Sequence, residues 1–462
     1  MRIVLSIIKW LIGLLLVVVA GLALWLYLVP PELIRVGSNY AAKIVCSNVF
    51  LAGRDAEEVL AEDVQAPGHW LLRFMRVEVD RAEGRVRAGL LGVSGGGLAV
   101  FREGTGCAAV PGGDLEAAFG ADAATVETAV PAATVQRAAA TSSPPEIAAI
   151  LDDPALAGPK MRAIVILRDG RIIGERYGAG FDAAQPLLGW SMTKAVNAAI
   201  VGTLVGAGRL GADDGDLLPQ WAGDSRSEIT VAHLLGMESG LSFREFYAGV
   251  ADVTRMLYLE PDMAAFAANQ PLLYEPGTDF AYSSGTSVIL SRVWQNTFDS
   301  DAAALAWPYR TLFAPLGMDT AVMETDVRGT FVGSSYMYAS ARDWARFGQL
   351  LLQDGVWEGR RVLPEGWAEW MRTPTRASGG EYGRGVWMQG PRVTTPMDRH
   401  QDDGFDLPED AYWLIGHDGQ TVTVIPSRRL VVLRMGLTPT VLAYKPQALV
   451  EAVVRALDGR ED

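Results

Sequence analysis

An uninterrupted apolar run from Trp10 to Leu28 dominates the start of the chain, and no charged residue falls within it. As a helix, this run is long enough to cross the hydrocarbon core of a bilayer. Arg2 and Lys9 precede it and Glu32 is the first charge after it, so we expect the rest of the chain in the periplasm, outside a bacterial inner membrane. We predict an uncleaved transmembrane anchor; a cleaved signal peptide with a small-residue site at residues 20–23 is the alternative.

Short strands are predicted in the region that follows, residues 31–145. Alternating apolar positions in Leu71–Val79 and Arg85–Leu91 predict a hairpin, and Leu98–Arg102 predicts a third strand after a turn at Gly95–Gly97. The region is therefore predicted to be small and β-rich, and the sequence leaves open whether it is a stalk, a substrate lid or an interaction module.

Strands and helices alternate after a Pro-containing linker at Thr141–Pro145, and Asp169-Gly170 is a strong hairpin signal. The predicted strands are Arg162–Leu167, Arg171–Tyr177, Tyr382–Met388, a strand from Tyr412 to Pro426 that runs through two glycines, and Leu430–Met435. The predicted helices are Ser191–Leu204, Ser227–Leu235, Thr286–Trp294, a serine-capped helix at Ser340–Leu351, and Lys445–Leu457. We therefore divide the chain into an anchor (1–30), the β-rich region (31–145) and an α/β domain (146–462).

Composition narrows the classes of function. A chain of 462 residues is long enough for two or three domains, and 49% hydrophobic residues are ordinary for a folded protein. A net charge of −14 argues against a nucleic-acid partner, because phosphate binding needs basic patches. We expect no cofactor and no metal, since His400 near Asp402 and Asp403 is typical of a solvated loop.

The chain has two cysteines, Cys46 and Cys107. In an exported protein such a pair favours a disulfide over a metal site, and two separate buried thiols are the alternative. Closing a loop of this length would stabilise the fold by roughly 4 kcal/mol in the chain-entropy model.

Ser191 and Lys194 are the first candidates for chemistry. They lie three residues apart at the predicted start of an apolar helix, where positions i and i+3 share a face. A desolvated ammonium loses its proton more easily, and the neutral amine could then accept the proton of Ser191 and make it a nucleophile. The same pattern also fits an N-capping serine followed by a solvated lysine.

Three other stretches contain candidate catalytic residues. Gly92–Gly96 fits the Gly-x-Ser-x-Gly motif, but a strand follows it where the motif needs a helix, so we interpret it as a hairpin turn. His233 is expected to pack in the core. Tyr282 sits in a turn rich in Gly and Pro before a helix, and a nearby lysine would favour its phenolate; a packing tyrosine is the alternative.

Three elements in chain order, Ser191-x-x-Lys194, Tyr282-Ser283-Ser284 and His417-Asp418-Gly419, resemble the serine β-lactamase and penicillin-binding protein superfamily. The similarity is closest to class C β-lactamase-like esterases and 6-aminohexanoate-oligomer hydrolases, and it covers about residues 160–457. It is supported by the stretches His233-Leu234-Leu235, Pro315-Leu316-Gly317-Met318 and Ala341–Gly348. The resemblance implies an α/β (α+β) fold of the β-lactamase/transpeptidase type, with an antiparallel sheet flanked by helices and a mostly helical subdomain.

The resemblance also implies roles for single residues. Ser191 would attack a carbonyl and form an acyl-enzyme, Lys194 would be the general base, and Tyr282 would relay the proton to the leaving group. The backbone N–H groups of Ser191 and Gln420 would form the oxyanion hole, in which one donor is typically worth about 3 kcal/mol of barrier. The residues implied to bind substrate around them are Trp190, Ser284, His417 and Gly419.

Two positions depart from the β-lactam-acting pattern. Ser284 replaces the asparagine of Tyr-x-Asn, and His417 replaces a lysine that helps to hold the β-lactam carboxylate. A histidine is largely uncharged at neutral pH, and Asp418 beside it adds negative charge, so anchoring of an anionic penicillin is weakened.

We therefore predict a membrane-anchored periplasmic serine hydrolase that cleaves an ester or amide of a small molecule or of the cell envelope. The alternatives are a peptidoglycan D,D-carboxypeptidase or a β-lactamase, and a non-catalytic envelope protein that uses the same fold for binding. A Ser-His-Asp triad through His417 is a minor alternative. The natural substrate depends on loops near residues 243–260 and 390–413.

Overall fold

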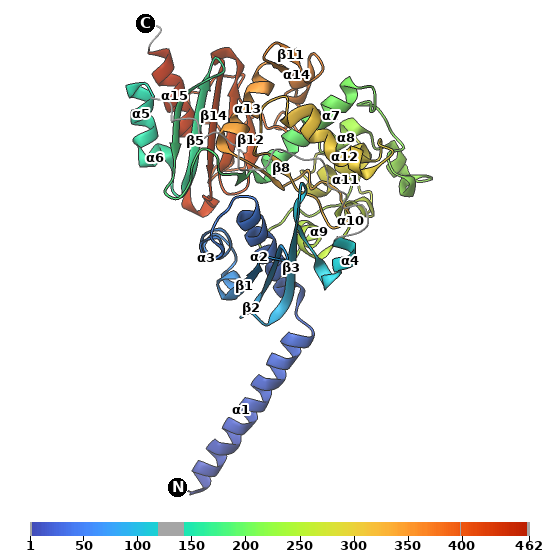
Figure 1. Ribbon diagram of the computed structural model, residues 1–462, viewed down its shortest axis with the longest axis vertical. Helices are drawn as coiled ribbons and strands as arrows, with labels where there is room; N and C mark the ends of the chain where they lie inside the picture. The colour runs from blue at the N-terminus through green and yellow to red at the C-terminus, as the bar shows by residue number, and fades with distance from the viewer. Residues whose placement is uncertain (1, 119–142, 398, 460–462) are drawn as a thin grey trace.

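The computed structural model describes residues 2–118, 143–397 and 399–459 (Figure 1). Helix α1 (Arg2–Leu28) projects from the rest of the molecule, and its apolar segment is long enough to cross a membrane and is not buried inside the protein. A signal sequence would meet the same criteria of length and composition. The remaining elements form a folded head in which the N-terminal region lies between α1 and the larger domain (Figure 1).

A five-stranded antiparallel sheet is the centre of the larger domain. Its strand order is β12-β13-β14-β5-β6, and the strands are β5 (Met161–Arg168), β6 (Arg171–Tyr177), β12 (Tyr412–Gly416), β13 (Gln420–Ile425) and β14 (Leu430–Gly436). The hairpin at Asp169-Gly170 is confirmed, and Asp169 takes the positive φ of +53° that a tight turn needs.

Helices cover both faces of this sheet (Figure 1). On one face α13 (Ala341–Leu352) packs Trp344 and Phe347 into the main core, and its predicted Ser340 cap is confirmed. On the other face α5 (Pro145–Asp152) and α15 (Gln447–Asp458) pack against the sheet and share a separate core with it. The predicted sandwich of helices and antiparallel sheet is therefore confirmed.

A mostly helical subdomain is inserted between β6 and β12. Its helices are α7 (Thr193–Gly206), α8 (Val231–Leu235), α9 (Asp252–Leu259), α10 (Met263–Ala268), α11 (Ser284–Gln295), α12 (Asp301–Pro308) and α14 (Trp367–Met371). Short strands complete it: β7 (Leu187–Leu188), β8 (Val322–Met323) and β9 (Met337–Ala339) form one sheet, and β10 (Val356–Trp357) pairs with β11 (Arg360–Arg361).

Two predicted strands of the larger domain are wrong. Tyr382–Met388 makes only isolated bridges. In one of them, Trp387 exchanges backbone hydrogen bonds with Trp413 at the edge of the sheet. The predicted strand Tyr412–Pro426 is two strands, since His417, Asp418 and Gly419 form the turn that joins β12 to β13. Asp418 and Gly419 both have positive φ, which a continuous strand does not allow.

One predicted helix begins too early. The structure starts α8 at Val231 with Thr230 as its cap, and a separate 3-10 turn occupies Ser225–Glu228. His233 closes the capping box by accepting a hydrogen bond from the Thr230 backbone N–H, at 3.2 Å. His233 is only partly buried and lies at the helix start, so the expectation that it packs in the core is wrong.

The N-terminal region contains a helix that the sequence analysis did not predict, α2 (Glu32–Phe50). It packs across a four-stranded antiparallel sheet of β1 (Met75–Asp80), β2 (Arg85–Leu90), β3 (Ser94–Arg102) and β4 (Gly106–Ala109). Several short helical segments complete this region: α3 (Ala56–Val59), η1 (Leu60–Gln65), η2 (Trp70–Phe74) and α4 (Leu115–Ala118).

Two predictions for this region are corrected. Residues 70–74 form a 3-10 helix where a strand was expected, and Gly95–Gly97 lie inside β3 where a turn was expected. The glycines are needed there because β3 crosses α2 closely: a Cβ on Gly97 would lie 2.3 Å from the backbone of Ser38. Of the predicted linker, Thr141–Pro145, the first two residues lie outside the described residues, and α5 already begins at Pro145.

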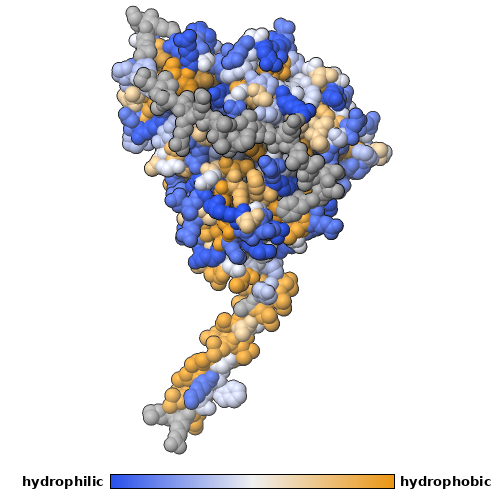
Figure 2. All heavy atoms as spheres, viewed as in Figure 1, coloured by the Kyte–Doolittle hydropathy of each residue, from blue (hydrophilic) through white to orange (hydrophobic). Residues whose placement is uncertain are grey.

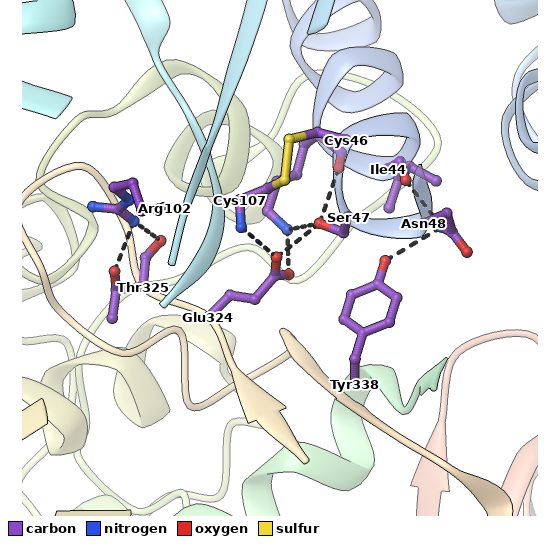
Figure 3. Close-up of a disulfide and its surroundings, with 10 residues drawn as sticks. Ile44, Cys46, Ser47, Asn48, Arg102, Cys107, Glu324, Thr325 and Tyr338 are labelled. Atoms are coloured by element: carbon purple, nitrogen blue, oxygen red, sulfur yellow. Dashed lines mark hydrogen bonds and ion pairs between the residues drawn. A yellow bond between two sulfur atoms is a disulfide. The ribbon is translucent and has the colours of Figure 1, made fainter. Parts of the chain in front are cut away.

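The predicted disulfide is confirmed: it joins Cys46 of α2 to Cys107 of β4 (Figure 3). Beside it, the carboxylate of Glu324, which belongs to the larger domain, is completely buried. Glu324 accepts hydrogen bonds from Lys43 Nζ at 2.5 Å, from Ser47 Oγ at 2.8 Å and from the Cys107 N–H at 2.7 Å. The N-terminal region and the larger domain therefore share one continuous core with a buried ion pair inside it.

Glu324→Ala should destabilise the protein by about 3–5 kcal/mol, because it leaves the buried Lys43 ammonium without its partner. The measurement is the urea midpoint of the detergent-solubilised chain. Glu369→Ala is the control, since it removes an exposed partner of Arg372 and should cost no more than about 1 kcal/mol. Equal midpoints for the two variants would contradict the role of Glu324 in joining the N-terminal region to the larger domain.

Candidate active site

Ser191 and Lys194 are brought together at the start of α7. Ser191 lies in the short 3-10 turn Trp190–Met192, and Lys194 follows in the first turn of the helix with 3% of its surface exposed. Lys194 Nζ is 3.3 Å from Ser191 Oγ. The lysine is buried, so the alternative of a capping serine with a solvated lysine is wrong.

The residue before the serine is held in an unusual backbone conformation. Trp190 has a φ of +49° although it is not a glycine, and 8% of its surface is exposed. A bulky residue in this region costs of order 1–3 kcal/mol, which the surrounding packing must offset. The strained turn presents Ser191 at the wall of a cavity.

Two further serines hold the amine of Lys194. Nζ donates to Ser284 Oγ at 3.2 Å and to the backbone oxygen of Ser334 at 3.1 Å. These residues come from the start of α11 and from the segment before β9, so three distant parts of the chain fix one nitrogen. Among the described residues, the amine has three hydrogen-bond partners, Ser191 Oγ, Ser284 Oγ and the Ser334 backbone oxygen, and all are neutral oxygen atoms.

Tyr282 also reaches this amine, but with its ring. Lys194 Nζ lies 4.5 Å from the centroid of the Tyr282 ring, a cation–π distance. The ring packs against Trp387 and Tyr382. Within the described part of the chain no hydrogen bond joins the Tyr282 hydroxyl to Ser191 or Lys194, so proton relay by Tyr282 stays a prediction.

A carboxylate that the sequence analysis missed supports this group. Glu245 Oε1 accepts hydrogen bonds from Ser284 Oγ at 2.5 Å and from the Tyr247 hydroxyl at 2.7 Å, and Glu245 Oε2 accepts from the Ser284 N–H at 2.9 Å. Burial of the hydroxyl, together with the Glu245 carboxylate, raises the pKa of Tyr247 well above its ordinary value, so this group remains a donor at neutral pH. No local motif distinguishes Glu245 from other loop acids; only the fold brings it to Ser284.

His417 borders the cavity from the turn after β12. Its ring packs against Trp190 and Tyr247, its side chain is half-exposed, and Nε2 lies 3.4 Å from Asp418 Oδ1. Burial raises the pKa of Asp418, and the neighbouring His417 opposes that shift. Of the residues expected to bind substrate, Trp190 and His417 line the cavity together with Ser191 and Tyr282.

Gln420 and Gly419 do not line this cavity, whereas Ile415, Gly416 and His417 do. Gln420 starts β13 behind the turn, with its side chain donating to the backbone oxygen of His417 at 3.3 Å. The backbone N–H and C=O of Trp413 bond to Trp387, on the side of β12 that faces away from β13. Backbone groups alternate in direction along a strand, so the N–H and C=O of Ile415, two residues further on, point to the same side. Ile415 is therefore better placed than Gln420 to donate toward the cavity.

The cavity has a volume of about 330 Å³ and is bounded by two parts of the chain. One side comes from the larger domain around Ser191. The opposite side comes from the N-terminal region, through Leu33, Val36, Tyr40, Leu71, Leu72 and Met75. The N-terminal region, whose role the sequence left open, thus borders the candidate nucleophile's cavity.

A model of the β-lactamase family matches residues 156–440, more than half of the chain. The chain belongs to the β-lactamase family. The matched segment includes Ser191, Lys194, Tyr282 and His417, and it leaves the N-terminal region outside.

Members of this superfamily are also found among similar proteins. The 6-aminohexanoate-dimer hydrolase of Paenarthrobacter ureafaciens is 26% identical over 220 residues, which are 45% of this chain and 56% of that protein. A Bacillus anthracis structure assigned as a 6-aminohexanoate-dimer hydrolase has a TM-score of 0.55 at 21% identity, covering 70% of this chain and 84% of that one. A penicillin-binding protein homologue from Caulobacter crescentus has a TM-score of 0.51 at 16% identity, covering 69% and 100%. The two structures support the fold of this β-lactamase family member.

Ser284→Ala should lower kcat/KM at least tenfold toward any ester that the wild type hydrolyses. It removes a hydrogen bond that holds the buried amine in place, and leaving a buried donor unsatisfied costs about 1–3 kcal/mol. Ser283→Ala is the matched control: Ser283 caps α11 through the Thr286 N–H, so its loss should cost about 1 kcal/mol of stability and leave kcat/KM unchanged. Equal kinetic effects of the two substitutions would contradict a role for Ser284 in holding Lys194.

Proposed function

We propose that this β-lactamase family member is a serine hydrolase that cleaves an ester or amide through an acyl-Ser191 intermediate. The observation that carries the proposal is the 3.3 Å contact between Lys194 Nζ and Ser191 Oγ beside a cavity. The proposal includes the anchor over residues 1–30, the N-terminal region over 31–145 and the catalytic domain over 146–462, with the head in the periplasm.

In the first half-reaction the neutral amine of Lys194 accepts the hydroxyl proton of Ser191 as Oγ attacks the substrate carbonyl. The resulting oxyanion would lie against the N–H groups of Ser191 and Ile415, donors of the kind that stabilise such intermediates. The carbon–oxygen or carbon–nitrogen bond to the leaving group then breaks. The leaving group takes the proton back from Lys194, directly or through the Tyr282 hydroxyl, and Ser191 remains acylated.

In the second half-reaction a water molecule replaces the leaving group. It gives one proton to Lys194, attacks the acyl carbon, and the carboxylic acid departs as Ser191 Oγ recovers that proton. Each group therefore returns to its starting state, and the net reaction adds one water across the ester or amide bond.

The charges around the cavity favour a neutral substrate. Glu245 lines it, and Asp418 lies directly behind His417, so an anionic β-lactam would meet carboxylates where a cation would be needed. The relative from Paenarthrobacter is named as a 6-aminohexanoate-dimer hydrolase, which supports hydrolysis of a small-molecule substrate by this chain.

Ser191→Ala should abolish hydrolysis of p-nitrophenyl butyrate and labelling by a fluorophosphonate probe. Lys194→Met should lower kcat by a factor of about 10² to 10⁴, the range of general acid–base catalysis. Lys445→Met is the matched control, since Lys445 lies beside Phe405, away from the cavity, and its loss should leave kcat unchanged. Nitrocefin should be a poor substrate.

Three results would contradict this proposal in different ways. Rapid nitrocefin turnover would favour the β-lactamase alternative. Retention of activity in Lys194→Met, with loss in His417→Ala as large as in Ser191→Ala, would favour the serine-histidine alternative. A wild type that neither turns over esters nor reacts with the probe would favour the non-catalytic binding protein.

A further inference from the structure

The wall that the N-terminal region contributes to the cavity is apolar. Leu33 and Val36 come from the first turns of α2, Leu71 and Leu72 from η2, and Met75 from the start of β1. Tyr40 is also part of this wall, but its hydroxyl donates to the Asp63 backbone oxygen at 3.1 Å and is therefore already satisfied. This side of the cavity offers hydrocarbon contacts to whatever group lies opposite Ser191.

The same wall lies next to the end of α1. Leu33 follows Leu28 by five residues, so at about 3.5 Å per residue the two lie within roughly 18 Å of each other. Ser94 Oγ donates to the Leu26 backbone oxygen at 2.5 Å, which holds the last turn of α1 against β3. The cavity is thus built beside the point where the chain would leave a membrane.

Large apolar side chains surround this point on the outer surface. We call Trp70, Phe74, Leu91 and Val93 the apolar rim; they are 60%, 45%, 63% and 67% exposed. Trp70 packs edge-on against Phe74, and the Phe74 backbone oxygen accepts a hydrogen bond from the Leu91 N–H at 2.8 Å. Figure 2 shows apolar surface continuing from α1 onto the base of the head.

Basic side chains accompany the rim. Arg73 and Arg76 are exposed and lie on either side of Phe74 and Met75 in the sequence. Exposed tryptophan and phenylalanine next to arginine are typical of a surface that rests on lipid headgroups. Isolated exposed apolar residues need no explanation, but four neighbouring ones beside an apolar helix do.

One short helix connects the rim to the cavity. In η2, Trp70 and Phe74 face outward, while Leu71 and Leu72 between them line the cavity. An apolar path therefore leads from the rim across η2 to the wall opposite Ser191. A volume of about 330 Å³ is near the lower end of the roughly 300–1,000 Å³ of small-molecule sites, which suits one hydrocarbon chain.

We propose that the substrate is a membrane-resident amphiphile with an acyl chain, bound as an ester or amide, and that the apolar rim rests on the bilayer and admits this chain. The acyl chain of the substrate lies against Leu33, Val36, Leu71, Leu72 and Met75, and its carbonyl carbon lies at Ser191 Oγ. This inference depends on the proposed serine hydrolase and on the anchor. The acyl group forms the ester with Ser191, the alcohol or amine leaves with its proton, and water releases the fatty acid.

The first test uses the full chain in detergent with p-nitrophenyl acetate, butyrate, octanoate and decanoate. We expect kcat/KM to rise about fourfold for each added methylene, the ratio that corresponds to about 0.8 kcal/mol per buried methylene, until the cavity is full. Leu71→Gln should lower kcat/KM for the decanoate at least tenfold and change that for the acetate less than twofold. Leu442→Gln, a half-exposed leucine away from the cavity, is the matched control and should alter neither.

The second test separates a lipid source from a dissolved one. The full chain is reconstituted in phosphatidylglycerol–phosphatidylcholine vesicles that contain didecanoylglycerol, and release of decanoate is measured. The double variant Trp70→Ser/Phe74→Ser should lower this release at least fivefold while turnover of p-nitrophenyl decanoate in detergent stays within twofold of wild type. A rim variant that lowers both rates equally, or neither, would overturn the membrane source.

The outcomes distinguish this inference from the proposed function. Ser191-dependent hydrolysis with kcat/KM flat or falling from acetate to decanoate would overturn the acyl-chain site and leave the serine hydrolase standing. Absence of Ser191-dependent hydrolysis for every ester would overturn both. If Leu71→Gln left the ratio of kcat/KM for the decanoate to that for the acetate unchanged, the N-terminal wall would not contact the acyl chain.

Discussion

The buried carboxylate of Glu324 is the constraint on which the head of this protein depends. A charge without solvent is tolerable only when its hydrogen-bonding capacity is met, and here the lysine of α2, a serine one turn further along that helix and the backbone N–H of Cys107 meet it. Burial lowers the pKa of Lys43 and the Glu324 carboxylate counteracts that shift. The disulfide from Cys46 to Cys107 ties the two donor elements together, so both present their donors to Glu324 as one unit.

The contact between the two parts matters because both the N-terminal region and the larger domain contribute to the candidate active site. The larger domain, which matches the β-lactamase family, contributes Ser191, Lys194 and the hydrogen bonds of Ser284 and Ser334 to the amine. The N-terminal region lies outside the match and contributes hydrocarbon surface to the facing wall. In the reaction we propose, the family's domain supplies the chemistry, and the added region selects the group that can lie next to the nucleophile.

The environment of the amine also differs from that of an ordinary surface lysine. Its hydrogen-bond partners are neutral oxygens, the nearest carboxylate of the network is held one serine away at Glu245, and an aromatic ring covers one side. Each contact is modest, but together they leave the nitrogen little freedom to move away from Ser191 Oγ. Pre-positioned groups of this kind avoid reorganisation during a reaction, which is where enzymes obtain much of their rate.

Local patterns in the sequence determined the elements whose causes are themselves local. The Asp169-Gly170 hairpin, the Ser340 cap of α13, the apolar length of α1 and the one-turn separation of Ser191 and Lys194 each depend on residues within a few positions of one another. The tertiary structure alone decided the hydrogen bond of Glu245 to Ser284, the ion pair of Lys43 with Glu324 and the apolar wall from residues 33–75. These contacts join residues up to 281 positions apart, and periodicity and turn chemistry carry no information about which distant surfaces will meet.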